Sequence, residues 1–127
     1  MKPTRGIKMD NEHGFKVGDI LVSTWGYNRT ITSWYKVIRT TKCKVIMNEL
    51  PVSYPTRYMS NTPGDYCMPV IDGKVDPAYP FVGYQPDGEV RGTSSQYKDG
   101  EVYVKLPGRY GQILYHWNGK PGWVNCD

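Results

Sequence analysis

The pattern of hydrophobic and polar positions along this chain predicts a β protein. Runs of β-branched and aromatic residues are bounded by glycines or by Asp-Gly and Asn-Gly pairs, which are typical of tight turns. In the clearest runs apolar and polar side chains alternate, as in a strand with one buried face. We predict five antiparallel strands: Ile20 to Trp25, Trp34 to Thr40, Cys43 to Leu50, Glu101 to Leu106 and Gln112 to Trp117.

Alternation also predicts which side chains of the last two strands face the core. In each of these strands three apolar or aromatic residues fall at every second position and therefore share one face. We expect all six to be largely buried: Val102, Val104, Leu106, Ile113, Tyr115 and Trp117.

The remaining segments do not follow this pattern. Residues 1–14 contain no periodic apolar positions, and we expect a flexible N-terminal arm followed by a single β domain over residues 15–127. Prolines interrupt residues 51–69 and 77–86, and a proline cannot donate to a strand ladder, so no regular central strand is predicted there. Met68 to Ile71 and Gly122 to Cys126 are expected as short strands.

Composition supports a mainly β fold with little helix. The chain has 127 residues, with 11 Tyr, 4 Trp and 14 Gly but a single Ala and four Leu. Strong helix formers are therefore scarce. Three early strands with a longer loop at Tyr27 to Ser33 are typical of an SH3-like small antiparallel barrel, and a partly open β roll can begin in the same way.

The sequence excludes several classes of protein. No apolar run approaches the roughly 18 to 20 residues of a membrane span, and no apolar stretch follows the basic N-terminus as in a secretory signal. We therefore expect a cytoplasmic protein. The cysteines Cys43, Cys67 and Cys126 form no C-x-x-C pair, so we predict free thiols, no metal site and no cofactor.

Enzyme signatures are absent from the sequence. It contains no phosphate-binding, dinucleotide-binding, zinc-protease or nucleophile-elbow motif. Of the two histidines, His13 lies in the expected arm and His116 in a predicted strand without a carboxylate nearby in the sequence. The chain is therefore predicted to be a binding protein with no catalytic residue, and a small hydrolase or transferase is the least favoured class.

The loop after the first strand is the most distinctive segment. Aromatic rings flank Gly26, and an amide, a guanidinium and a hydroxyl follow, a combination typical of recognition surfaces. The alternative is an aromatic pair that caps the core around a turn glycine. The candidate binding residues are Trp25, Tyr27, Asn28, Arg29 and Thr30.

Positive charge is concentrated in the first half of the chain. Residues 1–50 hold nine Lys or Arg against four Asp or Glu, a net charge of +5, whereas the rest carries −1. We expect nucleic-acid contacts from Arg29, Lys36, Arg39, Lys42 and Lys44, although uninterrupted alternation would put Lys36 and Arg39 on opposite faces of their strand. The alternative is a solvated strand face that only discourages edge pairing.

Two motifs resemble a known family. Phe15 to Tyr27, then Thr30 and Trp34-Tyr35-Lys36-Val37, resembles the S-W-G-Y-x-x-T core of a family of small bacteriophage and mobile-element proteins, and Trp117-Asn118-Gly119-Lys120-Pro121 is similar to that family's closing W-[DN]-G-K-P turn. Thr24, Asn28-Arg29 and Ile31 depart from its pattern. The resemblance implies a phage or plasmid origin and a compact β fold, and it supplies no activity.

Two functions therefore stay open at the level of sequence. The first is a phage or mobile-element accessory protein in the bacterial cytoplasm that binds nucleic acid, for which DNA is the favoured partner class over RNA, or a nucleic-acid-handling host complex. The second is an anti-defence inhibitor that blocks a host enzyme, such as a defence nuclease, through the aromatic loop. The two functions require different arrangements of charged residues, because only polyanion binding needs the cations to converge on one surface.

Overall fold

The computed structural model describes residues 11–25, 29–55, 65–84, 86, 88–108 and 112–126. Within these ranges the chain forms strands and no helix, which confirms the expected mainly β fold. The strands are β1 (Ile20–Trp25), β2 (Arg29–Thr40), β3 (Lys44–Glu49), β4 (Val52–Tyr54), β5 (Asp65–Pro69), β6 (Phe81–Tyr84), β7 (Glu89–Gln96), β8 (Val102–Lys105), β9 (Ile113–His116) and β10 (Gly122–Cys126).

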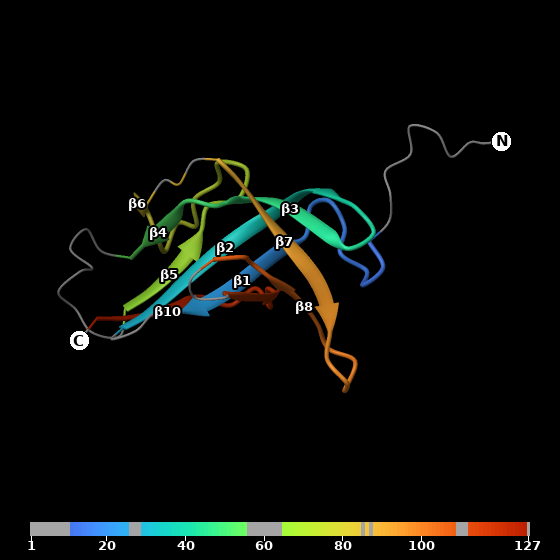
Figure 1. Cartoon of the computed structure of the whole chain (residues 1–127). Coiled ribbons are helices and arrows are strands. Elements are labelled where there is room, and N and C mark those ends of the chain that lie inside the picture. The colour runs from blue at the N-terminus through green and yellow to red at the C-terminus, as the bar shows by residue number, and fades with distance from the viewer. Residues whose placement is uncertain are drawn as a thin grey trace.

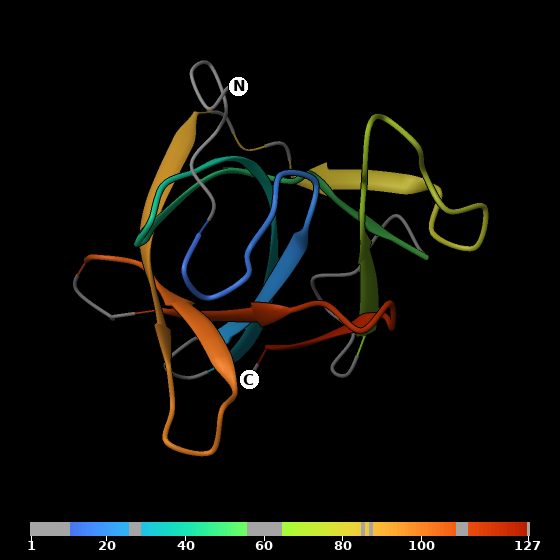
Figure 2. The same ribbon diagram turned by 90° about the vertical axis from the view of Figure 1, so that its right-hand side faces the viewer.

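Six of these strands close into an antiparallel barrel (Figures 1 and 2). Their order is β1-β9-β8-β7-β3-β2, and the pairing of β1 with β2 completes the ring. Figure 2 shows the described N-terminal segment, in blue, lying over the opening of this ring. The prediction of a small antiparallel barrel is therefore confirmed, in the closed form.

A small three-stranded sheet lies beside the barrel in the order β5-β4-β6 (Figure 1). Strand β10 links the two units, because it pairs with β5 on one side and with Arg29 and Thr30 of β2 on the other. The twelve-residue β2 is therefore shared, its first residues with β10 and its remainder with the barrel strands.

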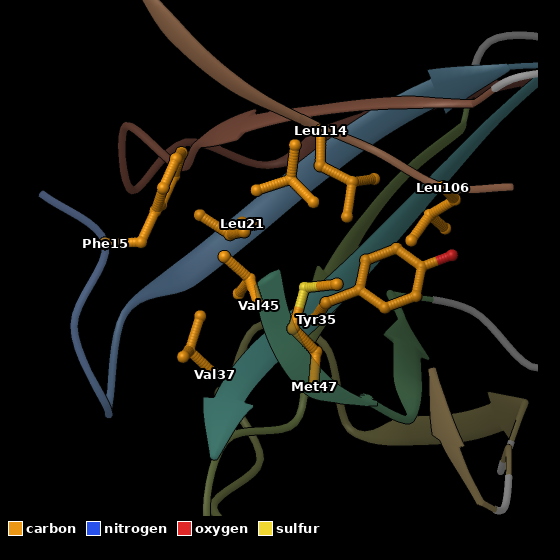
Figure 3. Packing of buried hydrophobic residues seen from close by; sticks show 9 residues of the cluster. Phe15, Leu21, Tyr35, Val37, Val45, Met47, Leu106 and Leu114 are labelled. Carbon is orange, nitrogen blue, oxygen red and sulfur yellow. The ribbon is translucent and has the colours of Figure 1, made fainter. Parts of the chain in front are cut away.

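Two hydrophobic cores hold these units together. The barrel core contains Phe15, Leu21, Tyr35, Val37, Val45, Met47, Val104, Leu106 and Leu114 (Figure 3). The second core joins the barrel wall to the small sheet and contains Trp34, Leu50, Val52 and Cys67, with Trp117 packed edge to face on Trp34 at 6.1 Å between ring centroids.

The five predicted strands are present, but the predicted inner face of β9 is wrong. Leu114 is fully buried in the barrel, whereas Ile113 and Tyr115 are only partly buried on the outer side. Alternation separates two faces without saying which one points inward. Pairing decides it, because Leu114 lies opposite Val104, a residue of the barrel core.

Strand β7 was not predicted. Two of its inward positions carry Gly92 and Ser94, so the segment lacks the apolar alternation by which strands are recognised. The proline-rich segments also contribute the short strands β4, in the middle of the small sheet, and β6, at its edge, so the expectation that residues 51–69 hold no central strand is wrong. A short strand is compatible with nearby prolines, because few of its residues need to donate to a neighbour.

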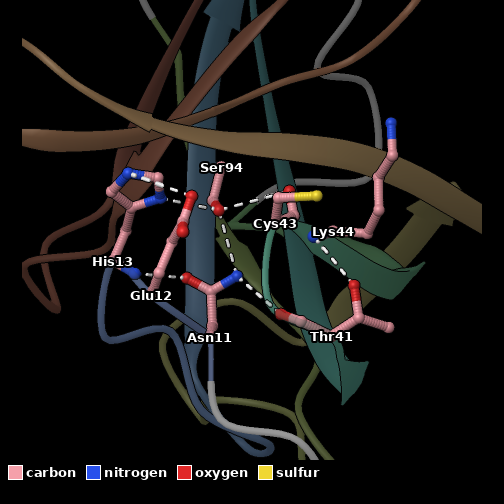
Figure 4. Close-up of polar contacts among 7 residues, drawn as sticks. All are labelled: Asn11, Glu12, His13, Thr41, Cys43, Lys44 and Ser94. Carbon is pink, nitrogen blue, oxygen red and sulfur yellow. Dashed lines mark hydrogen bonds and ion pairs between the residues drawn. The ribbon is translucent and has the colours of Figure 1, made fainter.

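The last residues of the predicted flexible arm are docked on the barrel (Figure 4). Asn11 is buried, and its Nδ2 donates to the Thr41 carbonyl and to Ser94 Oγ, each at 3.0 Å. The backbone N–H of Glu12 donates to the Lys42 carbonyl at 2.8 Å. The expected arm therefore does not extend to residues 11–14, and residues 1–10 lie outside the described ranges.

Candidate nucleic-acid interface

A β-bulge in β2 changes the face on which Arg39 lies. Val37 pairs with Met47 but Arg39 pairs with Ile46, so one extra residue, Ile38, is accommodated between them. Val37 points into the barrel and Arg39 points outward, on the same side as Lys36. The expectation that Lys36 and Arg39 occupy opposite faces is therefore wrong, because it assumed uninterrupted alternation.

The outward position of Arg39 begins a row of side chains across three strands. Arg39 of β2 lies opposite Ile46 of β3, and Ile46 lies opposite Arg91 of β7. Both arginines are exposed, and the isoleucine between them is buried although it points outward. The row thus places one guanidinium group on each side of an apolar side chain.

A second row lies next to the first. Lys44 of β3 is opposite Thr93 of β7, which is opposite Lys105 of β8. Neighbouring strands are about 4.8 Å apart, so the two rows bring cations from four strands within roughly 15 Å. We call this surface the basic face, and its cations are Arg39, Lys44, Arg91 and Lys105.

The basic face contains a groove of about 490 Å³. Its lining combines cations and hydroxyls with an apolar floor and includes no acidic side chain. Lys44 Nζ donates to Thr93 Oγ1 at 2.8 Å, so this ammonium group is held across the groove wall. The lining residues are Thr41, Lys44, Ile46, Arg91, Thr93, Lys105, Leu106 and Pro107.

The predicted cations have different electrostatic partners. Arg39 forms an ion pair with Glu89 at 3.5 Å, but both side chains are about half exposed, so the pair is weak and Arg39 can leave Glu89 for another anion. Lys36 instead binds Asp72 through a hydrogen-bonded ion pair, which lowers the pKa of that carboxyl. Lys42 is exposed at the β2–β3 turn and does not line the groove. Of the five cations predicted from sequence, the structure places Arg39 and Lys44 on the basic face.

Sequence reasoning missed Arg91 and Lys105. Both belong to the second half of the chain, whose net charge of −1 gives no sign of a basic surface. Lys105 follows Tyr103 at alternating spacing, which could have marked it as an outward residue of a predicted strand. Arg91 had no such signal, because β7 itself was not recognised.

Three tyrosines cluster beside the basic face. Tyr97 follows β7 and stacks on Tyr103 of β8, with ring centroids 4.3 Å apart and an interplanar angle of 26°. The hydroxyls of Tyr97 and Tyr115 of β9 are hydrogen-bonded at 2.9 Å, which raises the pKa of Tyr97 to about 12. We call Tyr97, Tyr103 and Tyr115 the tyrosine ledge.

The predicted loop at Tyr27 to Ser33 is shorter than expected, because Arg29 to Ser33 are the first residues of β2, which pairs with β1 and β10. Tyr27 and Asn28 fall in the gap between β1 and β2, and the side chains of Trp25, Arg29 and Thr30 are likewise not described. The backbone of Trp25 pairs with Ile31 at the end of the β1–β2 hairpin. The inhibitor hypothesis built on this loop therefore stays a prediction.

The two histidines make structural contacts. His13 Nδ1 lies 2.8 Å from Ser94 Oγ, a pair that resembles a nucleophile and its base. However, Ser94 is buried, accepts from Asn11, and donates to the Cys43 carbonyl at 3.3 Å (Figure 4). These contacts make Ser94 an anchor for the docked N-terminal segment.

The second histidine, His116, stacks on Phe15 at 4.8 Å between ring centroids. Its Nε2 lies 3.2 Å from Asp19 Oδ2. The carboxylate partner that the sequence did not show next to His116 thus comes from the turn before β1.

Cys43 and Cys67 are free thiols, as predicted. Cys43 is exposed, whereas burial raises the pKa of Cys67 to about 12. The side chain of Cys126 is not described. No cluster of three or more His, Cys, Asp or Glu residues that could hold a metal ion occurs in the described ranges.

Comparisons with protein-family models, with curated proteins and with solved structures found no match. The resemblance to a mobile-element family therefore stays an interpretation of the sequence motifs. Among the residues that the structure describes, no helix is long and apolar enough to cross a membrane.

Proposed function

We propose that this chain is a nucleic-acid-binding protein that contacts the phosphate backbone through the basic face. One observation carries the proposal: four exposed cations from four neighbouring strands lie on one face, and three of them, Lys44, Arg91 and Lys105, line a groove with no acidic lining. Convergence distinguishes a polyanion site from cations scattered over a solvated surface.

The chemistry of the groove suits a phosphodiester chain. Guanidinium groups bind phosphate oxygens through paired hydrogen bonds, and ammonium groups act as compact point charges. The hydroxyls of Thr41 and Thr93 add neutral donors at the groove wall. Because contacts to phosphate carry no information about the bases, binding through this groove is expected to be independent of sequence and sensitive to salt.

Charge reversal on the basic face tests this proposal. Replacing Arg91→Glu and Lys105→Glu together should abolish binding to a labelled oligonucleotide in fluorescence anisotropy at low salt. The matched control is Lys74→Glu with Lys120→Glu, which makes the same change in net charge at two exposed lysines away from the groove. The control should bind with nearly wild-type affinity, and circular dichroism should show both variants folded.

Salt dependence provides a second measurement on the wild-type protein. If about three or four cations contact phosphates, log Kd should change with log salt concentration with a slope of magnitude about 3 to 4 on duplex DNA. Replacing Arg39→Gln should reduce that slope by about 0.9, because one phosphate contact is lost. Undetectable binding at low salt, or equal loss in the control variant, would contradict the proposal.

A further inference from the structure

The tyrosine ledge holds one aromatic ring in a fixed, accessible position. Tyr97 is 40% exposed although it stacks on Tyr103 and its hydroxyl is hydrogen-bonded to Tyr115. The β7–β8 hairpin that carries Tyr97 extends away from the barrel in both ribbon views (Figures 1 and 2). An exposed ring that is already immobilised loses little conformational entropy when a ligand stacks on it.

The ledge is continuous with the basic face. Tyr103 and Lys105 are two residues apart on β8 and point to the same outer side, so their Cα atoms are separated by about 7 Å. On the paired strand β7, Ser95 lies opposite Tyr103 and Thr93 lies opposite Lys105, and no acidic side chain lies between Ser95 and Thr93. An aromatic surface and a phosphate-binding groove therefore share one strand pair.

Stacked aromatic rings and cations together select for single strands. A base in a duplex already stacks on its neighbours within the helix, whereas a base in a single strand offers a free face to a protein ring. We propose that this chain prefers single-stranded nucleic acid, with a base stacked on the exposed face of Tyr97 and the adjoining phosphates at Lys105 and Arg91. This inference rests on the proposed function and adds the class of substrate.

The charges of the hairpin limit the path of the strand. Asp99 and Glu101 are exposed at the β7–β8 turn, on the side of Tyr97 that faces away from the groove. Their carboxylates repel phosphates, so the bound strand ends at the ledge and runs from there toward the groove. A short site is expected, at the lower end of the roughly 4 to 16 nucleotides that small barrels cover.

The test compares one oligonucleotide in two forms. Anisotropy with labelled oligothymidylate of about twelve nucleotides, and with the same strand annealed to its complement, should show tighter binding to the single strand. Tyr97→Leu should weaken single-strand binding about tenfold and leave duplex binding within about twofold. Tyr97→Phe keeps the ring and should retain the preference. Tyr66→Leu is the matched control, because Tyr66 is an exposed tyrosine of the small sheet.

A measurement on the wild-type protein covers the case in which Tyr97→Leu does not fold. Photocrosslinking to a strand that contains 5-iodouracil, followed by peptide mapping, should place the adduct on the peptide with Tyr97. Adducts confined to other peptides, or equal affinity for the two forms of the oligonucleotide, would overturn the single-strand inference and leave the proposed function standing. Absence of binding to both forms would overturn the proposed function as well.

Discussion

Gly92 lies at the centre of β7 and has no room for a side chain. Its partner in the adjacent strand is Val45, so a β-carbon at this position points into the barrel core. An ideal Cβ built on Gly92 would lie 2.3 Å from Val104 Cγ1, 3.1 Å from the Lys105 carbonyl oxygen and 3.2 Å from Leu106 Cδ2. The substitution Gly92→Ala therefore tests the packing of the barrel directly.

The expected loss of stability in Gly92→Ala depends on whether the atoms around the new β-carbon can move. Val104 is fully buried and the Lys105 oxygen belongs to the backbone of the paired strand, so neither neighbour can swing aside. Overpacking of this kind costs about 1 to 3 kcal/mol, and we expect Gly92→Ala in the upper part of that range. Val104→Ala alone should cost roughly 2 to 3 kcal/mol, because it removes two buried methyl groups and leaves a cavity.

The double variant makes the argument specific. In Gly92→Ala with Val104→Ala, the new methyl group occupies space that the shortened side chain has vacated. The pair should therefore be less destabilised than the sum of the single variants, by about 1 to 2 kcal/mol. Urea unfolding followed by tryptophan fluorescence measures each free energy of unfolding, and Trp34, buried between the barrel and the small sheet, is a suitable reporter. Strict additivity would refute the proposed contact, and a cost of Gly92→Ala below about 0.5 kcal/mol would refute the packing of β7 against β8.

Two further predictions concern titratable groups. In the folded protein an aromatic disulfide reagent should modify Cys43 rapidly and spare Cys67, whose pKa is raised to about 12 by burial. After unfolding under conditions that prevent oxidation, three thiols should react, and a single reactive thiol would show that two cysteines are bridged. Ultraviolet titration of tyrosinate should show Tyr97 ionising near pH 12, above its ordinary value of 10.0, and Tyr115→Phe should lower that pKa. Because folding raises this pKa, the stability that Tyr97 contributes is present below about pH 10 and is lost as the pH rises toward 12. If the pKa of Tyr97 were the same in the Tyr115→Phe variant, that result would contradict the hydrogen bond.

The sequence by itself determined the class of fold and most of the barrel strands. Local chemistry suffices for this, because alternation and glycine turns act within a few residues. The predicted segments Ile20 to Trp25 and Glu101 to Leu106 became β1 and β8 with little change at their ends. The scarcity of helix formers likewise acts through composition alone.

Tertiary structure decided which side of each strand faces inward. Alternation in β9 is compatible with burial of Ile113 and Tyr115 or of Leu114, and only closure of the barrel against Val104 selects Leu114. Strand β7 could not be predicted from the sequence pattern for a related reason. Its inward Gly92 exists because Val104 leaves no space there, which is a property of the neighbouring strand and not of β7 itself.

The candidate site depended most on tertiary structure. Lys44 was identified from the sequence because it lies in a basic first half, and Arg39 was identified but assigned to the wrong face because a bulge has no local signal in this segment. Arg91 and Lys105 join these two only through the pairing of β7 with β3 and β8. Charge counted along the chain follows sequence position, whereas the potential that a phosphate meets depends on distance in space, which strand pairing sets.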